Sequence, residues 1–199
     1  MSMMGRSPHI RAECLWNSWC GQFPTFMRGG GAILVVEDNS DDAFLLEHAF
    51  VQAGLSAPLR FVTDGQKSIE YLEGRPPFND RTSYPLPNLL LVDLRMPHLD
   101  GFGLLDWLHH QPSTTPMLIG VLSGADDPQS VERAYRLGAK FHISKPHRFE
   151  DLVRIAEFLI HASGANSNEA VAFATTPEAA AAIGQNQTIL PIHLGPSAL

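Results

Sequence analysis

The chain has 199 residues, of which 44% are hydrophobic, and it carries a formal net charge of −7 with a pI near 5.6. This length favours one domain with appendages, and the acidic balance argues against a basic nucleic-acid-binding face. No apolar stretch approaches the roughly 20 residues of a membrane span, and Cys14 and Cys20 match neither a CxxC redox pair nor a zinc site. We therefore expect a cytoplasmic protein that binds neither nucleic acid nor membrane.

The chain opens with residues 1–31, which lack a hydrophobic period and end in three glycines, so we expect a flexible extension there. From residue 32 to residue 162, short apolar runs alternate with amphipathic segments. The runs are typical of strands covered on both faces, and they cover residues 32–36, 58–63, 88–93, 116–122 and 139–143. Apolar residues at helical spacing follow each run and predict helices over residues 40–53, 64–74, 101–110, 127–137 and 149–161.

Capping residues and glycines mark the ends of the first two helices. We expect Ser40 or Asp41 to cap the first helix and Asp64 to cap the second, and Gly54 and Gly74 follow their last turns. The apolar faces of the five helices are predicted to consist of Leu45, Leu46, Ala49, Phe50, Ala53, Ile69, Leu72, Phe102, Leu105, Leu108, Val131, Ala134, Tyr135, Leu152, Ile155, Ala156 and Leu159.

The composition changes after the last predicted helix. Residues 163–199 are rich in Ala, Asn, Thr and Pro, so we expect a low-complexity, disordered tail, with a short helix over 177–183 as the alternative.

The domain over residues 32–162 has five strand–helix units in series, which imply a parallel sheet with helices on both faces. Right-handed crossovers leave few topologies, and an α/β doubly wound sheet of five strands in the order 2-1-3-4-5, the flavodoxin-like arrangement, fits best.

Polar side chains follow four of the predicted strands. They are Glu37 and Asp38, then Asp93, Ser123 and Lys145. The carboxyl ends of parallel strands meet at one edge of the sheet, where ligands bind. The adjacent acids Glu37 and Asp38 are costly beside a core unless a cation neutralises them, and with Asp93 they offer the oxygen ligands that Mg²⁺ prefers. The alternative is that the adjacent acids only serve the N-terminus of the first helix.

These residue types are suited to phosphoryl transfer. The carboxylate of Asp93 can act as a nucleophile and become an aspartyl phosphate. A bound Mg²⁺ would offset the charge of the incoming phosphoryl group. Ser123 offers a hydroxyl to a phosphoryl oxygen, and Lys145 offers a compact point charge.

Four motifs occur in a fixed order and spacing: VVEDN at 35–39, VDLRMPHLDG at 92–101, VLSGA at 121–125 and ISKP at 143–146. In these motifs the chain resembles the receiver domain of two-component response regulators. The resemblance implies that Asp93 is the phosphoacceptor, modified to 4-aspartylphosphate by a histidine kinase. It also implies that Glu37, Asp38, Asp93 and the backbone carbonyl of Arg95 hold Mg²⁺, and that Ser123 and Lys145 bind the phosphoryl oxygens as catalytic residues.

The proline-rich segment 75–87 reads as a long loop, and long loops are often functional. With Asp80-Arg81 and Pro85-Leu86-Pro87 it resembles the small single-domain regulators that are paired with phytochrome-type histidine kinases. That resemblance implies a phytochrome-type kinase as partner, with a histidine phosphotransfer protein or a second copy of the chain as further partners. We expect output through the fourth helix, fifth strand and fifth helix, with apolar contributions from Val131, Tyr135, Phe141 and Phe158. Residues 163–199 contain no Lys or Arg, which argues against a DNA-binding output.

One position departs from the family's pattern. The family usually places Tyr or Phe three residues before the lysine as a rotameric switch, and here that position is His142. We predict that His142 is the switch residue and makes the output pH-sensitive, because histidine titrates near physiological pH; the alternative is a packed, neutral ring. Arg95, two residues after Asp93, is expected to contact the phosphoryl group or to screen it from water.

Three classes of function remain to be weighed. The leading one is a stand-alone phosphoacceptor that relays a kinase signal by protein–protein contacts. The alternative is a phosphorylation-independent, receiver-like interaction module. A phosphatase on a related sheet would need a second acid near Asp93, and Arg95 occupies the expected position. We expect no metabolic enzyme, because self-phosphorylation and self-dephosphorylation would make the protein a substrate of its own slow reaction.

Overall fold

The computed structural model describes residues 31–111, 117–125 and 127–164. The strands are β1 (Ala32–Val36), β2 (Leu59–Val62), β3 (Pro87–Val92), β4 (Leu118–Ser123) and β5 (Phe141–Ser144). The helices are α2 (Ser40–Gln52), α3 (Gly65–Glu73), α4 (Gly101–His109), α5 (Pro128–Arg136) and α6 (Phe149–Ser163). The predictions for Cys14, Cys20, the N-terminal extension and the 177–183 helix lie outside the described residues.

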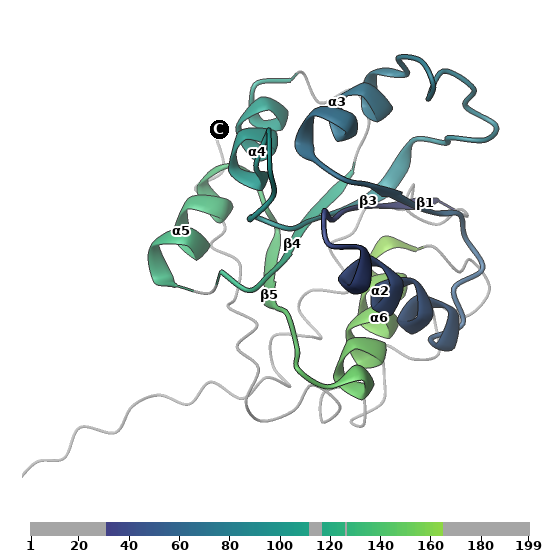
Figure 1. Ribbon diagram of the computed structural model, residues 1–199, viewed down its shortest axis with the longest axis vertical. Helices are drawn as coiled ribbons and strands as arrows, with labels where there is room; N and C mark the ends of the chain where they lie inside the picture. Colours follow the sequence, from purple (N-terminus) through teal and green to yellow (C-terminus); the bar gives the residue numbers. More distant parts are fainter. Residues whose placement is uncertain (1–30, 112–116, 126, 165–199) are drawn as a thin grey trace, which may run out of the picture.

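The five strands form one parallel sheet in the order β2-β1-β3-β4-β5, which confirms the predicted topology. Figure 1 shows α2 and α6 on one face of this sheet and α3, α4 and α5 on the other. Successive side chains of β1 point to opposite faces: Ile33 and Val35 pack toward α2 and α6, whereas Leu34 and Val36 pack toward α3 and α4. Both faces are covered, which explains why the strand sequences show no polar alternation. Among the described helices, none has the length and apolar composition needed to span a bilayer.

The first two helices begin and end largely as their sequences indicate. Asp64 caps α3 by accepting a hydrogen bond from the Lys67 amide at 2.8 Å, and Gly74 ends it in a left-handed conformation, as predicted. The prediction for the start of α2 was wrong by one residue. Asn39 is the cap, because its Oδ1 accepts from the amides of Asp41 and Asp42 at 2.8 and 3.2 Å, and Ser40 is already helical.

The predicted apolar faces of the helices are confirmed in part. Leu45 on α2 is 43% exposed. In α4 the predicted Leu105 is buried, and the predicted Phe102 and Leu108 are half-buried and pack against the core; Leu104, which was not predicted, is also buried. The Arg133 guanidinium of α5 stacks on the Phe102 ring, 4.2 Å from its centroid. The stripe predicted for α6 is confirmed, since Leu152, Ile155, Ala156 and Leu159 are all buried.

The apolar surface proposed over α5, β5 and α6 is also corrected. Val131 and Phe141 are buried at 4% and 1% exposure, so they belong to the core, and Tyr135 and Phe158 are half-buried. The large apolar side chains that the described surface exposes are instead Phe44, Leu45 and Val51 of α2 and Leu86 of the loop before β3.

Residues 75–86 form a loop, as predicted, and Pro87 begins β3. The loop is held to α3 by the Arg81 guanidinium, which donates to the carbonyls of Tyr71 and Leu72 at 2.8 and 2.9 Å. The Leu72 carbonyl lies in the last turn of the helix, where no intrahelical donor is available, whereas the Tyr71 carbonyl also accepts from the Gly74 amide at 3.1 Å. The rings of Tyr71, Phe78 and Tyr84 pack together, and the Tyr71 hydroxyl donates to the Pro85 carbonyl at 2.9 Å. The loop is therefore a packed part of the domain, at the end of β3 opposite Asp93.

Candidate functional site

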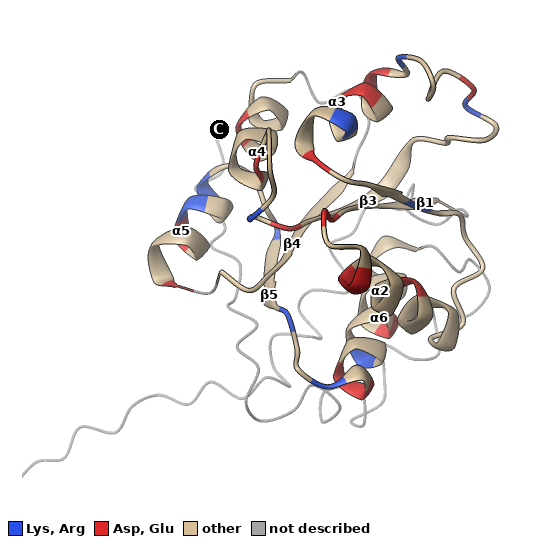
Figure 2. Ribbon diagram, in the orientation of Figure 1, with Lys and Arg blue, Asp and Glu red and all other residues tan. Residues whose placement is uncertain are grey.

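The predicted site residues meet at the carboxyl edge of the sheet. Glu37 and Asp38 directly follow β1, Asp93 follows β3, Ser123 is the last residue of β4 and Lys145 directly follows β5. Figure 2 shows acidic residues gathered where the ends of β1 and β3 meet the start of α2. The parallel topology therefore brings together residues that are separated by as many as 108 positions, from 37 to 145, in the chain.

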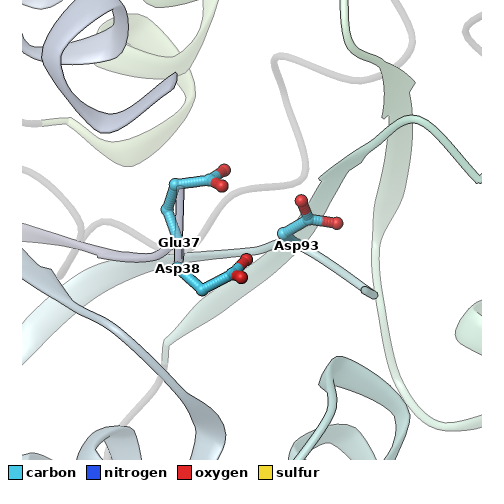
Figure 3. Close-up of side chains that lie close together, drawn as sticks. All are labelled: Glu37, Asp38 and Asp93. Atoms are coloured by element: carbon cyan, nitrogen blue, oxygen red, sulfur yellow. The ribbon is translucent and has the colours of Figure 1, made fainter. Parts of the chain in front are cut away.

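The acidic cluster consists of Glu37, Asp38 and Asp93, each of which offers a carboxylate oxygen within 4.8 Å of the other two. Figure 3 shows the side chains of Glu37 and Asp38 directed toward Asp93. Glu37 and Asp93 are buried and Asp38 is exposed. Burial raises the pKa of Glu37, and the neighbouring Asp93 carboxylate raises it further, although Lys145 and the Asn39 amide act in the opposite direction. Three hard oxygen donors of this kind, two of them desolvated and mutually repelling, fit a divalent cation such as Mg²⁺.

Both oxygens of the Asp93 carboxylate have hydrogen-bond donors. Oδ1 accepts from the Ser123 hydroxyl at 2.6 Å and from the Arg95 amide at 3.0 Å. Oδ2 accepts from the Lys145 ammonium at 2.6 Å. The Ser123 hydroxyl is fully buried and in turn accepts from the amides of Leu94 and Ala125 at 3.4 and 3.3 Å. The carboxylate is thus held in one orientation by groups from three different strand ends.

The loop after β3 folds back closely on Asp93. The Gly101 amide donates to the Leu94 carbonyl at 3.2 Å. A Cβ on Gly101 would lie 2.3 Å from the Asp93 carbonyl oxygen, so only glycine permits this approach. The same turn brings the Arg95 amide to Asp93. That the Arg95 backbone carbonyl binds the metal ion stays a prediction.

Lys145 contacts a third acid that the sequence analysis did not assign to the site. Its ammonium lies 2.7 Å from Glu37, 2.6 Å from Asp93 and 2.7 Å from Asp42. Burial alone would lower the pKa of Lys145, but hydrogen bonds to Asp42, Asp93 and Glu37 raise it well above its usual range. Asp42 lies in the first turn of α2. No spacing in the sequence distinguishes it from its neighbour Asp41, because only the folded chain places one of them beside Lys145.

The predicted switch residue, His142, lies on β5, three residues before Lys145. His142 is buried, with 2% exposure, and its Nε2 is 3.0 Å from the Ala125 carbonyl oxygen. A carbonyl can only accept, so Nε2 carries the proton that forms this bond. The ring therefore connects β5 to the segment that follows Ser123.

The Arg95 side chain lies at the exposed rim of the site. Its guanidinium donates to the Gly124 carbonyl at 3.2 Å, which joins the loop after β3 to the segment after β4. A cleft of about 440 Å³ opens beside it and is lined by Asp38, Met96, Phe102 and Ser130, among others. Arg95 thus lines the cleft together with Asp38, and its guanidinium is hydrogen-bonded to the segment after β4.

Comparisons with known proteins place these features in context. Residues 33–157 match the response regulator receiver domain family. The chain is 30% identical to the probable methanogenesis regulatory protein FilR2 of Methanothrix harundinacea, over 63% of this chain and 78% of that protein. It is 25% identical to response regulator Rcp1 of Synechocystis sp., over 63% of this chain and 83% of Rcp1. Among solved structures, response regulator RPA3017 in red light signaling of R. palustris has 34% identity and a TM-score of 0.61, covering 66% of this chain and 92% of that one.

Proposed function

The chain belongs to the response regulator receiver domain family of two-component signal transduction, and on that premise we propose that Asp93 accepts a phosphoryl group from a histidine kinase in a Mg²⁺-dependent reaction. The observation that carries this proposal is the setting of the Asp93 carboxylate. It is nearly buried, it belongs to a cluster of three acids, and it is oriented by the Ser123 hydroxyl and the Lys145 ammonium. An acid that only stabilised the fold would need no further acids around it.

In the proposed reaction, Asp93 is the nucleophile. One of its carboxylate oxygens forms a new bond to the phosphorus of a phosphohistidine on the kinase, while the phosphorus–nitrogen bond breaks. The electron pair of that bond stays on the imidazole nitrogen. When the other ring nitrogen of the phosphohistidine carries a proton, the products are 4-aspartylphosphate and a neutral histidine, so the charge of the phosphoryl group moves into the acidic site.

The phosphoryl group carries negative charge into a place that already holds three carboxylates, and the site must offset this repulsion. Glu37, Asp38, Asp93 and the Arg95 carbonyl would hold the Mg²⁺ ion, which when bound supplies positive charge next to the phosphoryl oxygens. Ser123 already donates its hydroxyl to Asp93 Oδ1, and because a hydroxyl rotates freely it can turn to a phosphoryl oxygen. Lys145 offers an ammonium within 2.6 Å of the reacting carboxylate.

We further infer that the phosphoryl donor is a kinase of the phytochrome type. The support is the 34% identity to a response regulator that acts in red light signaling. Helix α2 begins beside the site and exposes Phe44, Leu45 and Val51, at 58%, 43% and 71%. These exposed apolar side chains along α2 offer a contact surface for the partner.

The test is the intact mass of the protein after incubation with acetyl phosphate and Mg²⁺. Wild type is expected to gain one phosphoryl group, and Asp93→Asn and an EDTA-treated sample are expected to gain none. Asp41→Asn is the matched control, because it removes an exposed carboxylate near the site and should leave the adduct intact. If wild type stays unmodified at excess donor and Mg²⁺, the chain is instead a phosphorylation-independent interaction module.

A further inference from the structure

The Lys145 ammonium is surrounded by three carboxylates. Its contacts to Glu37, Asp42 and Asp93 are all between 2.6 and 2.7 Å. An ammonium has three N–H protons and no acceptor, so three carboxylates saturate it. Any phosphoryl oxygen that binds Lys145 must therefore take the place of one of these partners.

The three partners differ in how much water reaches them. The side chains of Glu37 and Asp93 are 2% and 8% exposed, whereas that of Asp42 is 39% exposed. The attraction between two charges falls as the surroundings become more water-like. The contact to Asp42 is thus the least costly of the three to exchange for a phosphoryl oxygen.

Capping of the α2 N-terminus does not explain the orientation of the Asp42 side chain. The N-terminus of α2 is capped by Asn39, whose Oδ1 accepts from the backbone amides of both Asp41 and Asp42. Asp41 lies on the same turn and is exposed, and within the described part of the chain its carboxylate forms no ion pair. The difference between these two neighbours is that the carboxylate of Asp42 reaches the ammonium.

We propose that Asp42 is a positioning residue for Lys145. It holds the ammonium at the mouth of the site before transfer and gives up this contact to a phosphoryl oxygen afterwards. A lysine side chain is a flexible four-carbon stem, and fixing its head group in advance removes an entropic cost from the step that needs it. This inference rests on the proposed phosphorylation of Asp93.

Loss of Asp42 has a second consequence. The ammonium would then be left with Glu37 and Asp93, two of the acids proposed to hold Mg²⁺, and would compete with the ion for their oxygens. We expect Asp42→Asn to slow phosphorylation by acetyl phosphate by about tenfold and to weaken Mg²⁺ binding by roughly threefold, effects typical of a lost positioning contact.

The experiment uses the full chain and two measurements. The first is the rate of phosphoryl uptake from acetyl phosphate, which releases acetate, followed by intact mass in wild type, Asp42→Asn, Asp42→Glu and Asp41→Asn. The second is Mg²⁺ affinity by titration calorimetry in the same variants, and also in Lys145→Met with and without Asp42→Asn. Melting temperatures establish that every variant is folded.

The proposal expects Asp42→Asn to be impaired in both measurements, Asp41→Asn to stay within twofold of wild type, and Asp42→Glu to recover most of the rate. In the Lys145→Met background the effect of Asp42→Asn on Mg²⁺ affinity should shrink to that of Asp41→Asn, as a double-mutant cycle requires for a direct coupling. Equal effects of Asp41→Asn and Asp42→Asn, or an effect that persists without Lys145, would overturn it. If wild type takes up no phosphoryl group, the proposed function fails, and the Mg²⁺ cycle alone decides whether Asp42 positions Lys145.

Discussion

Gly120 in the middle of β4 allows the Phe141 ring of β5 to lie across its backbone. The two residues are register partners in the sheet. A Cβ on Gly120 would lie 2.0 and 2.1 Å from two carbons of that ring, far inside van der Waals contact. The ring is 1% exposed and meets Phe158 edge-on, with centroids 5.9 Å apart, so it has little room to move away. Gly120→Ala should therefore overpack this part of the core.

The expected cost follows from two opposing effects. Overpacking a well-filled core typically costs about 1–3 kcal/mol, and the severity of this overlap points to the upper end, about 3 kcal/mol. Replacing a strand glycine by alanine returns about 0.5–1 kcal/mol through reduced backbone entropy in the unfolded chain. The net loss of unfolding free energy is then about 2 kcal/mol, which lowers the melting temperature of a domain of this size by roughly 8 °C.

The assay is chemical and thermal unfolding of Gly120→Ala, with Gly124→Ala as the control. A Cβ on Gly124 would meet nothing within 4 Å, so that variant should melt with wild type. Adding Phe141→Leu to Gly120→Ala should recover part of the loss, because a smaller side chain vacates the contested space. An unchanged stability of Gly120→Ala, or equal losses at positions 120 and 124, would refute the packing argument.

Three other predictions concern groups in or near the site. Burial raises the pKa of Glu37, so the contribution of this side chain to stability is complete below about pH 4.5 and is lost as pH rises through the raised pKa. Glu37→Gln in EDTA should therefore melt at a higher temperature than wild type at pH 7 but not at pH 4. Calorimetry should show that the same variant binds Mg²⁺ more weakly. Arg81→Ala should cost about 1–3 kcal/mol in urea unfolding by leaving the Leu72 carbonyl of α3 without its donor and removing one of two donors from the Tyr71 carbonyl. Arg75→Ala, which breaks an exposed pair with Glu73, should cost less than about 1 kcal/mol. If His142 is a pH-sensitive switch, phosphorylation-dependent partner binding should change between pH 6 and pH 8 in wild type and stay flat in His142→Phe; a flat wild-type profile would remove the switch hypothesis.

Much of the fold was predictable because the physics that sets it is periodic and local. Five apolar runs without polar alternation, separated by amphipathic helices, leave few arrangements other than a doubly wound parallel sheet. The location of Glu37, Asp93 and Lys145 followed from the same logic, since strand ends in such a sheet share one edge. The cap at Asp64 and the glycine end at Gly74 depend only on neighbouring residues and were also correct.

The errors occurred where tertiary contacts decide between locally equivalent residues. Ser40, Asp41 and Asn39 are all good caps, and in the folded chain Asn39 is the one whose side chain accepts from the first free amides of the helix. In α4 the predicted Leu105 is buried, but its neighbour Leu104, which the predicted face left out, is buried as well. Phe141 was assigned to the surface because sequence does not reveal that a glycine on the neighbouring strand makes space for its ring.

The site combines requirements that oppose each other. Glu37, Asp38, Asp42 and Asp93 carry four negative charges when ionised, and Lys145 is the cation that pairs with three of them. Burial of Glu37 beside Asp93 works against folding at neutral pH, as the raised pKa of Glu37 indicates. A fold selected only for stability would replace such acids with neutral side chains. Their presence at strand ends, where no capping role accounts for Glu37 or Asp93, agrees with the proposed function, in which a cation and a phosphoryl group would balance each other's charge.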